Sequence, residues 1–221
     1  MYIPLSHKAG SNITDPVGVM EYLREAVFEN QKIVKVAHNL SFEAMFLYAL
    51  GIVVCEPCYD TIAAAQLTLK SRHEFRDLSD SGLKLLATSL FGADMHDYTT
   101  VTVGRHFDEM NPADFETLRY ACADSDYTLR LYHKFNTWFA KNLPRHRVIV
   151  ERVESPTSVY CGMMKYNGVP MNVSAMYEKQ KEAEEKLSTL RSEIDEMTGG
   201  VDIGANASTS AFKHYLYINL G

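Results

Sequence analysis

The sequence has few cysteines, no long apolar run and no excess of positive charge. Four cysteines in 221 residues are too few and too scattered for a disulfide framework, which suits a reducing compartment. No stretch approaches the run of about 18 apolar residues that a membrane-spanning helix needs, and the N-terminus lacks the charged-then-apolar order of an export signal. These absences predict a soluble, cytoplasmic protein without a membrane partner.

The net charge of −6 gives the chain no overall positive field that would draw in nucleic acid. This counts against a stand-alone nucleic-acid binder, but less against a nuclease, whose pocket is acidic because it holds cations. Cys55 and Cys58 form a C-x-x-C pair, but zinc would need a second pair of ligands. We interpret the two cysteines as small apolar residues at the end of a strand.

Short apolar segments alternate with helical patterns through the first two thirds of the chain, which is typical of an α/β fold. Helix N-caps are predicted at Asp15, Ser41 and Asp60, and glycines are predicted to end two of the helices, at Gly51 and Gly92. The expected strands are 2–5, 32–37 and 52–55, and the expected helices begin near residues 16, 41, 60, 81 and 111.

Pro144 interrupts the helical pattern, and only helices are expected beyond it. They are predicted at about 145–166 and 174–197, followed by a glycine-rich loop over 199–210 and a short last helix that ends near Gly221. The sequence therefore predicts an α/β domain over residues 1–142 and an all-helical segment over 143–221.

Tyr120 and Asp124 are four residues apart in the long helical pattern that begins at 111. Residues with this spacing lie on one face of a helix, so a phenol and a carboxylate are presented to the same point. Asp126 points away from that face and is expected to be solvated. Glu43, in the first turn of an earlier helix, would taken alone be a partner for the helix dipole.

Three stretches together resemble the 3'-5' exonuclease domain of family-A, polymerase-I-like DNA polymerases. They are residues 36–43 (VAHNLSFE), the helices that contain 60–64 (DTIAA) and 82–87 (GLKLLA), and residues 120–126 (YACADSD). The order and spacing of the three agree with the family as well. Residues 154–172, and Asn206 with Ser208, resemble the segment that opens the family's polymerase domain, here the base of the thumb.

The resemblance implies an RNase H-like (DnaQ-like) fold and a function in proofreading, in a bacterial or phage-infected cell. It implies catalytic roles for Glu43, Asp124 and Tyr120, with the two carboxylates holding Mg²⁺ or Mn²⁺ in a two-metal site and Tyr120 placing the attacking water. Two such ions neutralise phosphate charge and activate water. His38, Asn39 and Phe42 would contact the single-stranded 3' end of DNA.

The sequence departs from the family in three places. The first motif, Asp-x-Glu, is absent, and residues 2–7 resemble the strand that follows it, so the fold is expected to lack its first strands. Glu43 stands where aspartate is usual. The palm would follow Gly221, so we expect no polymerisation and weak or no nuclease activity from this chain alone.

Two alternatives stay open. The chain can be a catalytically incomplete DNA-binding or assembly module of a split or truncated polymerase, with the missing strands or the palm supplied by a separate chain. It can also be a stand-alone ribonuclease-D-like enzyme, which shares the Tyr-x-x-x-Asp motif. The polymerase-like stretch after Glu154 argues against this second alternative.

Overall fold

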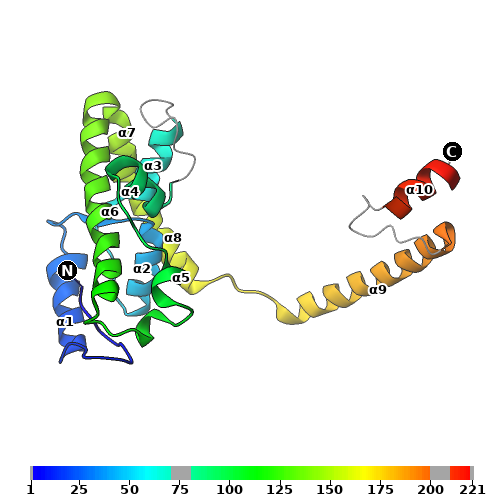
Figure 1. The fold of residues 1–221 in the computed structure, drawn as a ribbon, viewed down its shortest axis with the longest axis horizontal. Coiled ribbons are helices and arrows are strands. Elements are labelled where there is room, and N and C mark those ends of the chain that lie inside the picture. Colours follow the sequence, from blue (N-terminus) through cyan, green and yellow to red (C-terminus); the bar gives the residue numbers. More distant parts are fainter. Residues whose placement is uncertain (1, 71–80, 200–209, 220–221) are drawn as a thin grey trace. The chain divides into compact units, whose positions relative to one another are not determined.

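The computed structural model describes residues 2–70, 81–199 and 210–219, and it divides the chain into two compact units, Met1–Gly168 and Val169–Gly221 (Figure 1). The helices of the first unit are α1 (Pro16–Leu23), α2 (Leu40–Ala49), α3 (Thr61–Lys70), α4 (Leu83–Phe91), α5 (Tyr98–Thr102), α6 (Phe115–Asn142), α7 (Pro144–Ile149) and α8 (Ser155–Asn167). Three shorter helical pieces are η1 (Arg24–Phe28), η2 (Phe107–Glu109) and η3 (Val150–Glu154). The second unit contains α9 (Val173–Thr198) and α10 (Ser210–Asn219).

Two short strands form the sheet within the described residues. Strand β1 (Lys35–Ala37) pairs in parallel with β2 (Cys58–Asp60), with Val36 opposite Tyr59. Parallel neighbours need a crossover connection, which α2 provides here. The fold is therefore mostly helical around a small parallel sheet, and the sheet is smaller than the sequence pattern suggests.

Two of the predicted strands, 2–5 and 52–55, are wrong. Pro4 has no N–H to give to a neighbouring strand, and its carbonyl accepts from Ile13 within the same loop, at 3.0 Å. The N–H of Ile52 donates to the Leu47 carbonyl at the end of α2, at 2.9 Å, so it is not available to a neighbouring strand. Pairing with β1 begins only where the N–H of Lys35 reaches the Pro57 carbonyl, so the strand lies at 58–60.

Several predicted helix boundaries are confirmed. The Asp15 carboxylate accepts from the Gly18 N–H at 2.8 Å and caps α1. Gly51 and Gly92 follow α2 and α4 with φ of 76° and 66°, values that favour glycine. Pro144 begins α7 after α6 has ended at Asn142. The Ser41 cap is wrong, because α2 already begins at Leu40 and Asn39 occupies the N-cap position.

Helix α6 forms the main support of the first unit. It carries Leu131, Phe135 and Phe139, each with at most 1% of its surface exposed, and these residues pack with Leu86 of α4 and Val150 of η3. Burial of large apolar side chains of this kind is the main stabilising contribution in a core. The core therefore fixes α4 and η3 against α6, and α6 is the helix that carries Asp124.

A second apolar cluster joins α2 to α8. Leu40 and Ala44 of α2 pack with Val159 of α8, together with Val54 and Cys58. The helices approach closely at Gly162, where an added Cβ would lie 2.6 Å from the Ser41 carbonyl oxygen. The helices between residue 143 and Gly168 thus belong to the first compact unit. The division into domains at 142/143 stays a prediction.

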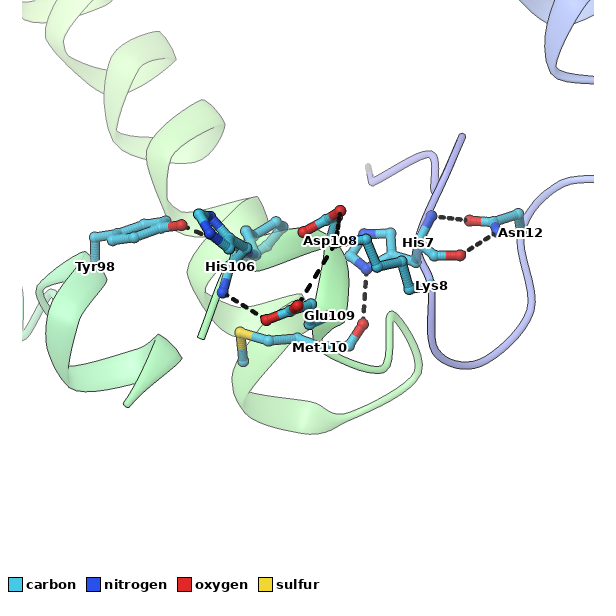
Figure 2. A network of polar contacts seen from close by, with 9 residues as sticks. His7, Lys8, Asn12, Tyr98, His106, Asp108, Glu109 and Met110 are labelled. Atoms are coloured by element: carbon cyan, nitrogen blue, oxygen red, sulfur yellow. Dashed lines mark hydrogen bonds and ion pairs between the residues drawn. The ribbon is translucent and has the colours of Figure 1, made fainter. Parts of the chain in front are cut away.

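The N-terminal segment is tied to the loop that precedes α6 (Figure 2). His7 Nδ1–H donates to the Met110 carbonyl at 2.7 Å, and the Lys8 ammonium pairs with Asp108 at 2.9 Å. Asn12 closes the turn by hydrogen bonding both main-chain groups of His7. These contacts give residues 7–12 a fixed place although they form no strand.

The second unit is described by itself. Helix α9 is capped by Asn172, whose side chain accepts from the Ala175 N–H at 3.1 Å, and it ends at Gly199 with a φ of 65°. The loop predicted for 199–210 lies, apart from its two end residues, outside the described residues, while α10 is the predicted last helix. No helix among the described residues has the length and apolar character needed to cross a membrane.

Candidate active site

Strand β1 leads directly into the start of α2 through His38 and Asn39. Asn39 has a φ of 72°, a left-handed conformation that asparagine tolerates better than most residues. This sharp reversal starts α2 at Leu40 and places Glu43 in its first turn. The local backbone therefore positions Glu43 beside the end of β1.

The carboxylate of Asp60 holds this reversal in place. It accepts from the main-chain N–H groups of Asn39 and Leu40, at 3.0 Å each, and from that of Ile62 at the start of α3, also at 3.0 Å. The side chain is buried, with 1% of the residue exposed. The predicted structural role of Asp60 as an N-cap of α3 is confirmed, and the same carboxylate caps α2 as well.

Glu43 and Asp124 line one cavity of about 340 Å³. Its walls come from β1, α2, α4 and α6, namely Val36, Ala37, His38, Glu43, Leu83, Asp124, Ser125, Thr128 and Leu129. Two carboxylates that lie 81 positions apart in the sequence thus share one open pocket with an imidazole. The structure brings these predicted site residues together.

The pocket raises the pKa of both carboxyl groups. Partial exclusion of water, together with the negative charges of Asp60 and Asp124, raises the pKa of Glu43 to about 7. Desolvation raises the pKa of Asp124 as well, and the nearby Lys84 ammonium opposes this shift. Carboxyl groups with raised pKa values in a shared cavity are typical of functional sites.

His38 lines the same cavity as the two carboxylates, and its ring is hydrogen bonded to Thr61. The Thr61 hydroxyl donates to the Ala37 carbonyl at 3.1 Å, so the 2.8 Å contact between Thr61 and His38 must be donated by Nδ1–H. Nε2 makes no hydrogen bond of normal geometry among the described residues, although a main-chain contact with Ser81 raises the pKa of the ring. Burial lowers the pKa of His38, and the charge of Asp60 only partly opposes that effect.

Tyr120 lies one turn before Asp124 on α6 but is not among the residues that line the cavity. Its ring packs edge-on against Tyr98 and at a tilt against Phe107, with centroids 6.3 and 5.7 Å away. Burial raises the pKa of the phenol, and the charge of Asp124 adds to that shift. Tyr120 is thus close enough for the charge of Asp124 to raise its pKa, while its ring packs against Tyr98 and Phe107.

Asn39 and Phe42 lie outside the cavity lining. Asn39 is exposed, and its side-chain oxygen accepts from the Ser41 hydroxyl at 2.9 Å, which supports the turn. Phe42 is 52% exposed and contacts Phe46 at 4.8 Å between ring centroids. These rings offer apolar surface on α2 beside the site. Asp126 is exposed, as expected, and pairs with Arg130 at 2.9 Å.

Lys84 is a site residue that sequence reasoning missed. Its ammonium lies 5.3 Å from the centre of the Tyr120 ring and 3.1 Å from the Asp97 carboxylate, and it lowers the pKa of Asp124. The signal was present in the stretch 82–87, where a lysine interrupts the apolar pattern. Lys84 supplies positive charge near Asp124, and its side chain is 31% exposed.

The carboxylates suit one hard cation better than two. Magnesium prefers oxygen ligands and is often held by one or two carboxylates together with water and substrate phosphate, which Glu43 and Asp124 can provide. Asp60 cannot add a ligand easily, because its oxygens already accept three main-chain N–H groups. Within the described part of the chain, no three acidic, histidine or cysteine side chains converge on one metal position.

A comparison with known protein families matches residues 1–138 to the family described as the 3'-5' exonuclease of DNA polymerase A. The match covers β1, α2, β2, α3, α4 and almost all of α6, so it includes every residue that lines the acidic cavity. A mostly helical unit around a small parallel sheet is compatible with a domain of the RNase H-like kind. The helices after residue 138 lie beyond the match, and their resemblance to the start of a polymerase domain stays a prediction.

Proposed function

Because the chain belongs to the 3'-5' exonuclease family of DNA polymerase A, we propose that it removes nucleotides from a single-stranded 3' end during proofreading. The substrate would be DNA, and the reaction would be hydrolysis of the terminal phosphodiester bond. The observation that carries the proposal is the shared cavity of Glu43 and Asp124, two carboxylates from different helices with raised pKa values. Family membership alone would not single out these two side chains.

Glu43 and Asp124 would hold Mg²⁺ or Mn²⁺. When bound, such an ion neutralises phosphate charge and makes water a better nucleophile at neutral pH. The raised pKa of Glu43, about 7, supports this role, because no positive group in the described part of the chain offsets the charge of this carboxylate. The positive charge of Lys84 opposes the rise in the pKa of Asp124 and would therefore favour its ionised form.

The remaining predicted residues would bind and orient the DNA end. Tyr120 would orient water through its hydroxyl group, since its ring is already held by Tyr98 and Phe107. His38 would accept a hydrogen bond through Nε2, and Phe42 would offer a face for stacking of a base. Asn39 would contribute through the shape of the turn that it forms.

The free side of β1 supports a further part of the proposal. Among the described strands β1 pairs with β2 alone, and Val36 and Ala37 of β1 line the acidic cavity. An unpaired strand edge is a template for another strand. A strand that carries acidic residues, from an upstream region or a separate chain, would both extend the sheet and complete a two-metal site.

A second candidate function is that of a catalytically incomplete DNA-binding or assembly module in a split or truncated polymerase. The observation that favours it is the small number of carboxylates that the described residues bring to the cavity. Asp60 accepts hydrogen bonds from main-chain N–H groups, and of the described carboxylates Glu43 and Asp124 alone line the cavity. Such a module would bind the 3' end without cutting it.

The test is degradation of a single-stranded DNA oligonucleotide with Mg²⁺ or Mn²⁺, followed in parallel on 3'-labelled and 5'-labelled strands. Asp124→Asn removes one carboxylate of the cavity with little change of shape. Asp195→Asn makes the same chemical change on an exposed turn of α9 and serves as the matched control. Stepwise shortening from the 3' end, lost in Asp124→Asn and kept in Asp195→Asn, supports the exonuclease.

Two other outcomes are informative. Tight binding of the 3' end without shortening would contradict the exonuclease and favour the incomplete module. Shortening that is equal in the wild type and in Asp124→Asn would show that the activity comes from another site, and it would contradict the assignment of this cavity.

A further inference from the structure

A second cavity, of about 620 Å³, lies along α6 away from the acidic cavity. It is lined by residues of α6 and by the last residue of α4, namely Phe91, Arg130, His133, Lys134, Thr137, Trp138, Lys141 and Asn142. None of these lines the acidic cavity. Figure 1 shows α4 beside α6, and α4 contributes Phe91 to the lining of the cavity.

Helical geometry separates the two cavities. With about 100° of rotation per residue, Arg130, Lys134 and Lys141 lie roughly 120 to 160° around α6 from Thr128. Asp124, the α6 carboxylate of the acidic cavity, lies roughly 80 to 120° around the helix from the same three cations, so the acidic and basic cavities lie on neighbouring faces of α6. The basic cavity is thus a separate surface of the same helix.

The basic cavity has a concentrated positive charge in a chain whose net charge is −6. Its eight lining residues include two lysines, one arginine and one histidine, and no carboxylate. Arg130 is partly neutralised by Asp126, at 2.9 Å. Neither Lys134 nor Lys141 has a carboxylate within ion-pair distance among the residues that the structure describes.

Aromatic rings are interleaved with these cations. The Lys134 ammonium lies 5.7 Å from the centre of the Phe91 ring, and the Arg130 guanidinium lies 5.3 Å from that of Tyr127. The rings of Phe91 and Tyr127 are themselves 6.1 Å apart. Phe91 and Tyr127 are partly buried, and a row of cations beside partly accessible rings is a combination that binds the backbone and bases of a single strand.

We propose that this basic cavity binds the phosphate backbone of a nucleic-acid strand at a distance from the end that is cut. The choice of nucleic acid over an acidic protein rests on the proposed function, together with the aromatic rings. Lys134 and Lys141 are seven residues apart, or about 10 Å along the helix axis, so they contact different phosphates of one strand. The cavity holds the strand and has no part in hydrolysis.

The test uses the full chain with Lys134→Gln and Lys141→Gln combined, in EDTA so that no DNA is cut. Binding of a fluorescently labelled single-stranded oligonucleotide is followed by anisotropy over a range of salt concentrations. The control combines Lys179→Gln and Lys181→Gln, which remove the same charge from exposed positions of α9. Circular dichroism checks that both variants keep their helices.

The expected result is a loss of affinity of about tenfold or more at low salt in the double variant of α6. The slope of log K against log salt should become shallower by about 1.4, since each phosphate contact to a single strand contributes about 0.7. The control should stay within about twofold of the wild type. Equal losses in both variants, or no loss in the α6 variant, would overturn the proposal.

Two further measurements distinguish this proposal from binding of an acidic protein and from a role of the basic cavity in hydrolysis. If polyglutamate binding is lost in the α6 variant while DNA binding is unchanged, the cavity serves an acidic protein and the proposal is overturned. Cleavage of a dinucleotide, whose single phosphodiester bond would occupy the acidic cavity, should be the same in the α6 variant as in the wild type. A wild-type chain that cuts nothing would contradict the proposed function, while the binding data would still decide the role of the basic cavity.

Discussion

The carboxylate of Asp60 accepts a 3.0 Å hydrogen bond from the main-chain N–H of Leu40, which lies twenty residues earlier in the chain. Through this bond the residue that ends β2 fixes the start of α2 and so the position of Glu43. The N–H of Asp60 in turn donates to the Ser155 hydroxyl at 2.8 Å. One buried residue therefore connects the sheet, the helix that carries a site residue, and α8.

Asp60→Ala should lower the free energy of unfolding by about 3 kcal/mol, because it leaves one buried N–H group, that of Leu40, and two partly buried ones, those of Asn39 and Ile62, without an acceptor. Urea denaturation followed by circular dichroism measures the change. The control is Asp114→Ala, since Asp114 is the N-cap residue of α6 but makes no capping hydrogen bond with its side chain. A loss in Asp60→Ala no larger than that in Asp114→Ala would contradict the double-cap role.

Gly162→Ala should destabilise the packing of α8 on α2. The added Cβ would lie 2.6 Å from the Ser41 carbonyl oxygen and 2.9 Å from the Met45 nitrogen, both of them backbone atoms that cannot move aside alone. We expect a loss of about 2 kcal/mol in stability, although alanine favours a helix by about 1 kcal/mol over glycine. The exposed neighbour Cys161, changed to alanine, should differ little from the wild type. A more stable Gly162→Ala protein would show that the helices lie further apart.

Glu43→Gln should stabilise the metal-free protein at high pH more than at low pH. The carboxyl has a pKa of 4.5 when free and about 7 in the folded chain, so the folded chain binds more protons between these values. Stability therefore falls as pH rises through this range, and glutamine removes the effect. Thermal unfolding in EDTA at pH 4.5 and pH 8 measures it, with the exposed Glu178→Gln as control. An equal change in Tm at both pH values would contradict the raised pKa.

Tyr120→Phe should separate the hydroxyl of Tyr120 from its ring. The ring contacts with Tyr98 and Phe107 remain, so Tm should change by about 1 °C or less. If the hydroxyl orients water, shortening of 3'-labelled DNA should fall by about tenfold to a hundredfold. Tyr98→Phe is the matched control, although it also removes a contact from the Phe107 N–H at 3.2 Å. Unchanged shortening in Tyr120→Phe would leave Tyr120 with a packing role only.

The parts of the fold that depend on local signals could be predicted from the sequence. Proline at the start of α7, glycine after α4 and the long apolar pattern of α6 are local, and the structure has these elements where the sequence places them. The strands 2–5 and 52–55 could not be rejected in this way, because a strand depends on a partner that the sequence does not name. The hydrogen bonds of Ile13 and Ile52 exclude them.

The site was predictable where its residues belong to recognisable motifs. Glu43 and Asp124 were predicted to act together, and the structure places them on one cavity. Lys84 and the double role of Asp60 were missed because both depend on contacts between elements far apart in the chain. Phe42 and Asn39 lie beside the cavity lining, and their contact with DNA remains a prediction.

The most direct measurement is a titration of the full chain with Mn²⁺, followed by electron paramagnetic resonance of the free ion. If Glu43 and Asp124 share one cation, the wild type binds one Mn²⁺ per chain at the tightest site, and both Glu43→Gln and Asp124→Asn lose it. Asp195→Asn should bind as the wild type does. A tight Mn²⁺ site that survives in both cavity variants would contradict the assignment of the acidic cavity as the active site.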